Sequence, residues 1–406
     1  MKLNTKHIPK IISLFLSLIF TAMPFYGEVN ADCDTTVWYV NVYPGSEIYE
    51  LEGHAALRIK SFEMDVAVNY GLFSFSEPNF VYRFVKGETD YKVGALPWQM
   101  FEREYIDNGR RMVAHKLNLS STQKALLIDM LQENVRPENC VYRYNYVLDN
   151  CATRPLRMVE LALNDTIILP EPTGIPKIDT FRGMMRYYHK NYPWYQFGID
   201  IALGTGIDRP ITVREKSFAP VVLDSQLDDA KIGEGANKPF VLETEILNDT
   251  APEEVVDAAT PWWLSPLFIM WLLSLAVAVY AIYSVFKKEK FPRLVASVVF
   301  AIFGLAGLLV AFLVFISVHE ATSPNYNLLW LNPLCFVPVV ALWIKKAKIV
   351  NKLYFLLNFV FLMCLLIVWI CGIQSPNPAF IPLVLADMTL SGLYIYQFCI
   401  KWKKTH

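Results

Sequence analysis

Two stretches of this sequence, Gly53-His54-Ala55-Ala56-Leu57 and, much later in the chain, Asp149-Asn150-Cys151-Ala152-Thr153, decide how it is interpreted. A cysteine becomes a nucleophile only as the thiolate, so it needs a neighbouring base, and a helix N-terminus lowers its pKa further. Asn150 is a favoured N-cap residue and an apolar-periodic segment follows it, so we expect the sulfur to lie near the positive end of a helix dipole. Together, Cys151 and His54 predict a thiol enzyme.

A third polar residue completes the predicted site. His54 stands at the head of a predicted strand over 55–59, and Asn69 ends the next predicted strand over 66–70. Hairpin geometry can place the two side chains on one face, where the amide would hold the second imidazole nitrogen and fix its tautomer. The sequence therefore predicts a Cys-His-Asn triad, with Asp65 as the competing partner of His54.

The remaining histidines and cysteines give no further site. His115 and His189 lack comparable surroundings, and we expect both at the surface. Cys and His residues have no ligand spacing such as Cys-x-x-Cys, so we predict neither a metal nor a cofactor.

Composition narrows the class of protein. Of the 406 residues, 54% are hydrophobic, which is too apolar for a purely soluble protein, and the excess lies in the last third. The net charge of -1 comes from scattered residues without a basic stripe. Nucleic acid is therefore not an expected partner.

The N-terminus has the pattern of an export signal. Lys2, Lys6 and Lys10 precede the apolar run Ile11–Phe20, and small residues surround Ala31. This pattern predicts a signal peptide over 1–31, either cleaved or retained as an anchor.

The exported part contains an odd number of cysteines, namely Cys33, Cys140 and Cys151. In an oxidising compartment, a disulfide between the first two would leave Cys151 as the free thiol. We therefore predict a Cys33–Cys140 disulfide.

The last third predicts a bundle of about five transmembrane helices. The apolar stretches lie near 264–286, 294–318, 328–344, 353–373 and 380–400. Lysine-rich connections fall on every second side, which by the positive-inside rule predicts an inner-membrane protein with a periplasmic N-terminal domain and a cytoplasmic C-terminus. Asp387 is the one carboxylate in a predicted span, and either a functional or a structural role is open to it.

The predicted organisation is therefore α+β followed by all-α. An exported catalytic domain over 32–247 contains short strands, beginning with 36–42, and helical patterns over 122–134 and after Cys151. An acidic linker over 248–263 leads into the transmembrane domain over 264–406.

Seven segments of the exported domain resemble the Lnb-type lipoprotein N-acyltransferases. They are Val42-Tyr43-Pro44-Gly45-Ser46, Gly53-His54-Ala55-Ala56-Leu57-Arg58, Asn69-Tyr70-Gly71-Leu72-Phe73-Ser74-Phe75, Pro78-Asn79-Phe80, Gly87-Glu88-Thr89-Asp90-Tyr91, Tyr142-Arg143-Tyr144-Asn145-Tyr146 and Asn150-Cys151-Ala152-Thr153-Arg154. More distantly, the order of His before Cys is similar to permuted NlpC/P60 and lecithin:retinol acyltransferase-like proteins. That similarity implies a permuted papain-like core.

The resemblance also implies an activity. Cys151 would be the nucleophile, His54 the base and Asn69 the residue that orients it, with Asn150, Arg154 and Tyr146 supporting the site. The enzyme would be a cysteine-dependent acyltransferase. It would move a fatty acyl chain from a membrane phospholipid, through a thioester on Cys151, to the α-amine of the N-terminal diacylglyceryl-cysteine of lipoproteins.

Two other functions remain open. The same core could serve a periplasmic peptidoglycan hydrolase or amidase of NlpC/P60 type, and the chain could be a non-enzymatic envelope assembly factor. A cell-wall hydrolase would not need five spans, and a binding module would not need a cysteine, a histidine and an amide in this order.

Overall fold

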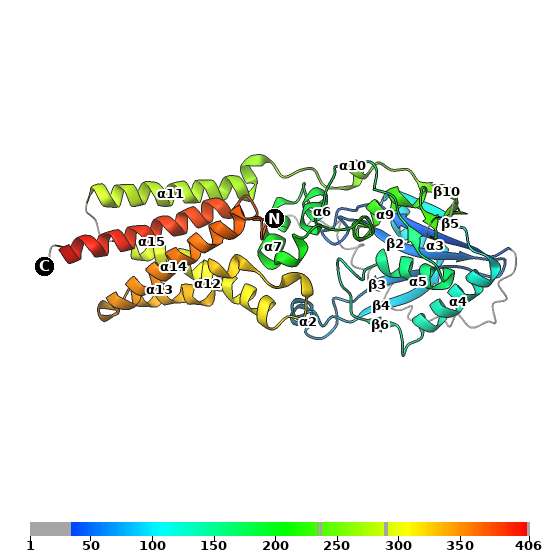
Figure 1. Cartoon of the computed structure of the whole chain (residues 1–406), viewed down its shortest axis with the longest axis horizontal. Helices are drawn as coiled ribbons and strands as arrows, with labels where there is room; N and C mark the ends of the chain where they lie inside the picture. The colour runs from blue at the N-terminus through cyan, green and yellow to red at the C-terminus, as the bar shows by residue number, and fades with distance from the viewer. Residues whose placement is uncertain (1–33, 234, 236–237, 288–290, 404–406) are drawn as a thin grey trace, which may run out of the picture. The chain divides into compact units, whose positions relative to one another are not determined.

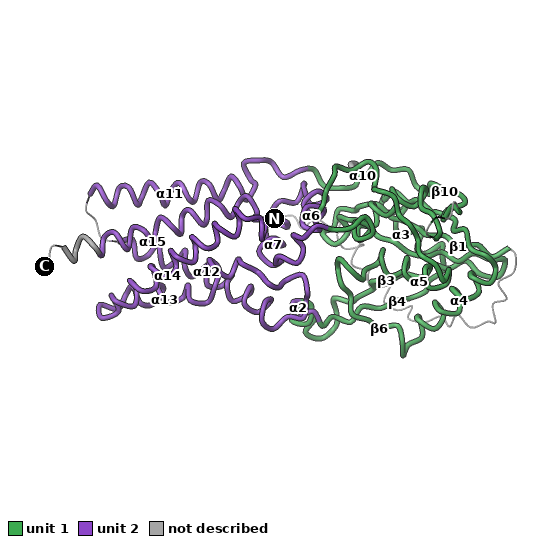
Figure 2. The backbone as a smooth tube through the Cα atoms, in the orientation of Figure 1, with its two compact units in different colours: residues 1–84, 88–179, 211–258 green, residues 85–87, 180–210, 259–406 purple. Residues whose placement is uncertain are grey.

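The computed structural model describes residues 34–233, 235, 238–287 and 291–403. These residues form two compact units, coloured separately in Figure 2. The first comprises the described parts of 1–84, 88–179 and 211–258, and the second those of 85–87, 180–210 and 259–406. The predicted signal peptide and Cys33 lie outside the described residues, so the signal peptide and the Cys33–Cys140 disulfide stay predictions.

An antiparallel sheet with the strand order β10-β5-β1-β2-β3-β4-β6 is the centre of the first unit (Figure 1). Its strands are β1 (Thr36–Val42), β2 (His54–Lys60), β3 (Asp65–Leu72), β4 (Tyr91–Pro97), β5 (Met112–Leu117), β6 (Val141–Tyr142) and β10 (Val241–Asn248). A smaller sheet contains β7 (Ile167–Ile168), β8 (Lys231–Ile232) and β9 (Lys238–Pro239). The first three strands confirm the predicted antiparallel strands.

Helices bury both faces of the large sheet. The unit contains the first five residues of α2 (Phe80–Lys86). It also contains α3 (Trp98–Asp107), α4 (Ser121–Val135), α5 (Thr153–Leu163), α8 (Val213–Lys216), α9 (Pro220–Leu227) and α10 (Pro252–Val255). Alternate β2 residues point to opposite sides, so Leu57 packs with α4, α5 and α9 whereas Ala56 packs with α3. This confirms a mixed α+β domain.

The second unit is helical. Its α-helices are α6 (Phe181–Tyr188), α7 (Pro193–Ala202), α11 (Pro266–Phe286), α12 (Arg293–Phe315), α13 (Phe336–Ala341), α14 (Lys348–Ile370) and α15 (Phe380–Lys403). Short 3₁₀ helices lie in several of the connections, namely η2 (Thr205–Ile207), η3 (Trp262–Leu264), η4 (Glu320–Thr322), η5 (Tyr326–Leu329), η6 (Pro333–Cys335) and η7 (Lys345–Ala347). Among the described residues, four helices are long and apolar enough to cross a membrane, and they are α11, α12, α14 and α15.

The third predicted span, 328–344, is not a continuous helix in the structure, whereas the other four predicted spans each contain one long helix. The segment consists of η5, η6 and the six-residue α13. Pro333 and Pro338 each lack a backbone N–H, which limits continuous helical hydrogen bonding. The broken segment packs between α12 and α14, where neighbouring helices can satisfy the backbone groups that it leaves free.

Residues 180–210 belong to the second unit, although the predicted catalytic domain included them. Buried Arg182 pairs with Asp200 and Asp208, each at 2.7 Å. Asn377, in the connection between α14 and α15, donates to Asp200 Oδ2 at 2.9 Å. A buried charge without partners is costly, so this network ties α6 and α7 to the membrane helices.

Asp387 lies fully buried inside the second unit, on α15. Its Oδ1 accepts hydrogen bonds from Asn358 of α14 at 2.7 Å and from Ser391 at 3.2 Å. These contacts support the structural alternative, a polar link between neighbouring membrane helices.

Two glycines on membrane helices allow a matched test of this packing. A Cβ on Gly307 of α12 would overlap the backbone of Asn332, whereas a Cβ on Gly392 of α15 would meet no atom within 4 Å. We expect Gly307→Ala to destabilise the protein by about 1–3 kcal/mol. Gly392→Ala should leave stability unchanged or raise it by up to about 1 kcal/mol through helix propensity. Thermal unfolding of the purified protein in detergent measures both, and equal midpoints for the two variants would contradict the close approach.

Candidate active site

The register of β2 and β3 brings His54 and Asn69 together. Ala56 lies opposite Asn69 in the antiparallel pair, so His54 is a diagonal neighbour of Asn69 on the same face of the sheet. His54 Nε2 lies 2.6 Å from Asn69 Oδ1. The amide oxygen can only accept, so Nε2 carries the hydrogen and Nδ1 is left as a proton acceptor.

The residue before His54 fixes where the strand begins. Gly53 has a φ of +89°, and a Cβ there would lie 2.5 Å from the carbonyl oxygen of Val42. Glycine is the residue that adopts this conformation without steric cost. The turn into β2, and with it the position of the imidazole, therefore depends on Gly53.

Asp65, the alternative partner of His54, is engaged elsewhere. Its carboxylate accepts two hydrogen bonds from Arg58, at 2.8 Å from Nε and 2.7 Å from the terminal nitrogen. Asp65 pairs with Lys60 at the opposite end of β2 from His54. The geometry therefore favours Asn69 as the residue that orients the imidazole.

Asn150 holds the segment that carries Cys151. Its Oδ1 accepts from the backbone N–H groups of Ala152 at 2.9 Å and Thr153 at 3.0 Å, just where α5 begins. Its Nδ2 donates to the carbonyl groups of Tyr146 and Phe218. Every hydrogen-bonding group of this buried amide therefore has a partner, which fixes the backbone on both sides of Cys151.

The Cys151 sulfur is enclosed, with 7% of the residue exposed. Burial raises its pKa, and hydrogen bonds from the Tyr144 hydroxyl and the backbone N–H of Ala55 oppose that rise only in part. The Tyr144 hydroxyl lies 3.8 Å from Sγ. The expected preference for thiolate is therefore wrong for the resting protein, because desolvation of the charged form outweighs the donors.

His54 is also neutral at rest. Burial lowers the pKa of its imidazole to about 4, and the positive charge of Arg110 acts in the same direction, while the bond to Asn69 opposes both. Tyr105 of α3 covers the ring, with the centroids 6.1 Å apart. Among the described contacts, no hydrogen bond joins His54 to Cys151, although the thiol lies at the backbone of the next residue, Ala55. The neutral thiol therefore bonds the backbone at the start of β2, one residue after the neutral imidazole of His54.

The other predicted supporting residues have structural partners. Arg154 forms two parallel hydrogen bonds with Asp149 and lies over the ring of Tyr142 at 3.8 Å. Tyr146 packs near Phe218, with ring centroids 6.2 Å apart. Both residues stabilise the loop before Cys151, and neither is among the residues that the structure shows bonded to Sγ.

Tyr144 is the residue of this site that the sequence analysis missed. It belongs to the segment Tyr142-Arg143-Tyr144-Asn145-Tyr146, in which every second residue is a tyrosine. In an extended backbone alternate side chains lie on the same side, so this spacing indicates that the three tyrosines share one side. The spacing does not indicate which of the three rings contacts the thiol.

His115 and His189 are buried rather than at the surface, which corrects the prediction. His115 lies between Asp224 and Asp228, at 2.8 Å and 2.9 Å from its two ring nitrogens. His189 Nδ1 lies 2.7 Å from Gln196 Oε1. These partners come from distant or later segments, which local sequence does not reveal.

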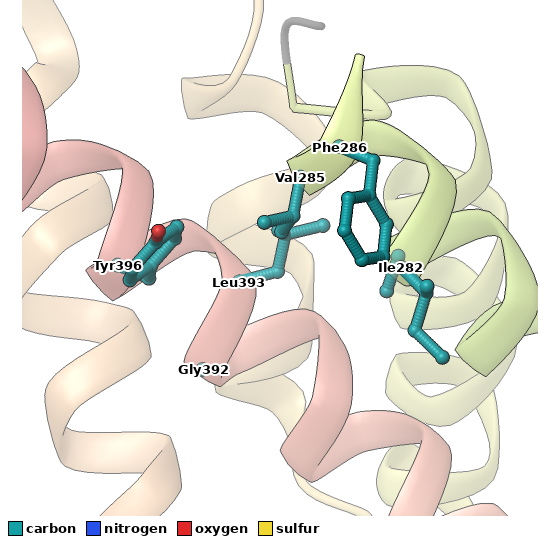
Figure 3. Close-up of a pocket in the computed structure, with 7 residues that line it drawn as sticks. Ile282, Val285, Phe286, Gly392, Leu393 and Tyr396 are labelled. Carbon is teal, nitrogen blue, oxygen red and sulfur yellow. The ribbon is translucent and has the colours of Figure 1, made fainter. Parts of the chain in front are cut away.

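The described residues contain no group of three or more His, Cys, Asp or Glu side chains that could hold a metal ion. A pocket of about 390 Å³ lies between α11 and α15 (Figure 3). Its lining consists of Ala281, Ile282, Val285, Phe286, Gly392, Leu393 and Tyr396. Apart from the Tyr396 hydroxyl this lining is apolar, and it includes none of the predicted catalytic residues.

Together, the fold and the helices define a multi-pass membrane protein with an α+β domain ahead of its membrane helices. Comparison with known families agrees with this class. A model described as the Lnb N-terminal periplasmic domain matches residues 24–187, and one described as the Lnb transmembrane domain matches residues 258–403. The chain therefore belongs to the Lnb family, as its sequence motifs predicted, and its N-terminal domain is periplasmic. Searches of curated proteins and of solved structures found no match.

The protonation states give a test of the resting site. Because burial keeps Cys151 as a thiol and His54 unprotonated above about pH 4, alkylation of Cys151 by iodoacetamide should be slow at neutral pH and rise steadily towards alkaline pH. Mass spectrometry of the Cys151 peptide measures the rate, with Cys151→Ser as the blank. His54→Ala should leave the profile nearly in place. A rate plateau from about pH 5 to about pH 7 that His54→Ala abolishes would instead reveal a thiolate–imidazolium pair.

Proposed function

We propose that this protein is a lipoprotein N-acyltransferase that carries the acyl chain as a thioester on Cys151. The observation that supports this most directly is a buried thiol that bonds the backbone of Ala55, the residue after His54, whose imidazole Nε2 is held by Asn69. This pair belongs to a chain with membrane-spanning helices, which suits a lipid substrate. The proposed location is the inner membrane, with a cytoplasmic C-terminus.

The first half-reaction would load the enzyme. As Sγ attacks the ester carbonyl of a phospholipid, Nδ1 of His54 takes the thiol proton, and Asn69 stabilises the imidazolium that forms. The carbon–oxygen bond to the glycerol then breaks, and His54 gives the proton to the departing oxygen. The products are a lysophospholipid and acyl-Cys151.

Donors for the developing negative charge stand close to the sulfur. The backbone N–H of Ala55 and the Tyr144 hydroxyl both hydrogen-bond Sγ. We assign to them the stabilisation of charge on sulfur and on the attacked carbonyl oxygen. In a site closed to water, such preorganised donors are worth more than they are in solution.

The second half-reaction would consume the thioester. The α-amine of a diacylglyceryl-cysteine at a lipoprotein N-terminus attacks the acyl carbon, His54 takes the proton that the amine loses, and Cys151 leaves and regains it. A terminal α-amine has a pKa of about 8, so a useful fraction is uncharged near neutral pH. An amide forms and a thioester breaks, so the step needs neither a nucleotide nor a metal.

Trapping the intermediate tests the proposal. Purified protein given phosphatidylethanolamine and no amine acceptor should gain one fatty acyl mass on the Cys151 peptide, and neutral hydroxylamine should remove it. Loss of nucleophile or base costs about three orders of magnitude or more, so Cys151→Ser and His54→Ala should show no trapped acyl group. Asn69→Ala should slow loading by about 10²-fold, whereas Asp65→Asn should load at nearly the wild-type rate. An acyl group found only on another residue would contradict the mechanism.

A further inference from the structure

Helix α7 in the second unit has the reverse polarity of a helix at a water surface. Its amide and its carboxylate side chain, Gln196 and Asp200, lie one turn apart and are both buried. The exposed residues of the helix are Trp194, which is 43% exposed, and Gly198. A helix in water normally turns its charged and polar residues outwards. The outer face of α7 is therefore not suited to water.

The buried polar residues of α7 are bonded inside the second unit. Asp200 pairs with Arg182 at 2.7 Å and accepts a hydrogen bond from Asn377 at 2.9 Å. Gln196 Oε1 lies 2.7 Å from Nδ1 of His189. Polar groups that face the protein, with apolar groups facing outwards, are typical of helices surrounded by lipid.

The C-terminal end of α7 is capped by side chains of the protein. The last three carbonyl oxygens of the helix belong to residues 200–202. Asn327 Nδ2 lies 3.0 Å from the first of them, and Asn325 Nδ2 lies 2.9 Å from the second and 3.2 Å from the third. At a water surface the solvent can satisfy such groups, whereas in a bilayer the protein must supply the donors. Helix α7 meets this requirement of a lipid environment.

The N-terminal end of α7 is bonded to the start of a membrane span in the same unit (Figure 2). Trp194 Nε1 donates to the carbonyl oxygen of Leu264 at 2.8 Å, just before α11 begins at Pro266. Trp262 and Trp263 precede this point and are 68% and 53% exposed. Tryptophan is enriched at the boundary between bilayer and water. Because the domain ahead of α11 is periplasmic, this boundary is the periplasmic one.

We propose that α7 is a membrane-embedded helix, whose outer face with Trp194 and Gly198 contacts lipid in the periplasmic leaflet. Lipid is the occupant that fits, because this face carries no charge and continues from the lipid-facing side of a membrane span. The ten residues of α7 extend about 15 Å, which is about half the thickness of the hydrocarbon core, so the helix enters one leaflet only. Residues 188–257 lie outside both family matches, and the inference does not depend on the proposed acyltransferase function.

Gly198 allows a test without a change in packing, because a Cβ there would meet no atom within 4 Å. The full-length protein is reconstituted in phosphatidylcholine nanodiscs, and its thermal unfolding midpoint is measured. Gly198→Asp should lower the midpoint by at least about 2–4 °C, because a carboxylate is costly in lipid. Gly198→Leu should not lower it. Leu126→Asp is the control in water, because Leu126 of α4 is 45% exposed in the first unit, and it should match wild type.

Photolabelling of the wild-type protein tests the same contact without a variant. The nanodiscs then contain a diether phosphatidylcholine with a diazirine in one alkyl chain, and its ether bonds cannot donate an acyl group to Cys151. After irradiation, mass spectrometry should find lipid attached to the peptides of α7 and α11, with the α4 peptide at the level of the unirradiated sample. Label on α11 without label on α7 would overturn the inference, because α7 would then face water or the periplasmic domain. A Gly198→Asp protein as stable as Gly198→Leu would overturn it as well.

Discussion

The hydrogen bond from His54 Nε2 to Asn69 Oδ1 determines which imidazole nitrogen is free to take a proton, and the proposed chemistry depends on that choice. The bond exists because β2 and β3 pair in a register that places the two side chains on one face. A shift of one residue would send Asn69 to the opposite face. Gly53 fixes the start of β2, and the bonds of Asn150 fix the segment before α5. The proposed base and the proposed nucleophile are therefore each positioned by the local backbone.

Burial gives this site its particular chemistry. It raises the pKa of the thiol and lowers that of the imidazole, so the resting pair carries no charge. In the proposed mechanism thiolate forms only as the proton moves to Nδ1, so the site stays unreactive until a substrate carbonyl arrives. A reactive ion pair in an oxidising compartment would invite oxidation, whereas a buried neutral thiol resists it. The apolar surroundings that suppress ionisation are also suited to a lipid ester.

Local sequence predicted the strands around His54 and the helix after Cys151, because alternation and helical periodicity act over a few residues. The N-cap of that helix is Ala152 rather than the expected Asn150. Local sequence also proposed Asn69, whose place follows from hairpin pairing. It did not reveal Tyr144, since three tyrosines share one alternating segment, nor the burial of His115 between two aspartates more than a hundred residues away. Pro333 and Pro338 give a local reason for the break in the third predicted span. The grouping of 180–210 with the membrane helices instead depends on tertiary contacts of Asp200, which no local pattern encodes.

The central claim is that Cys151 transfers an acyl chain to the N-terminus of lipoproteins. Mass spectrometry of the N-terminal peptide of an endogenous lipoprotein, from cells whose only copy of this protein is wild type or Cys151→Ser, tests it most directly. The account predicts an amide-linked fatty acyl group on the terminal cysteine with the wild-type protein and a free α-amine with the variant, at equal protein levels. An N-acylated terminal cysteine in the Cys151→Ser cells would contradict it.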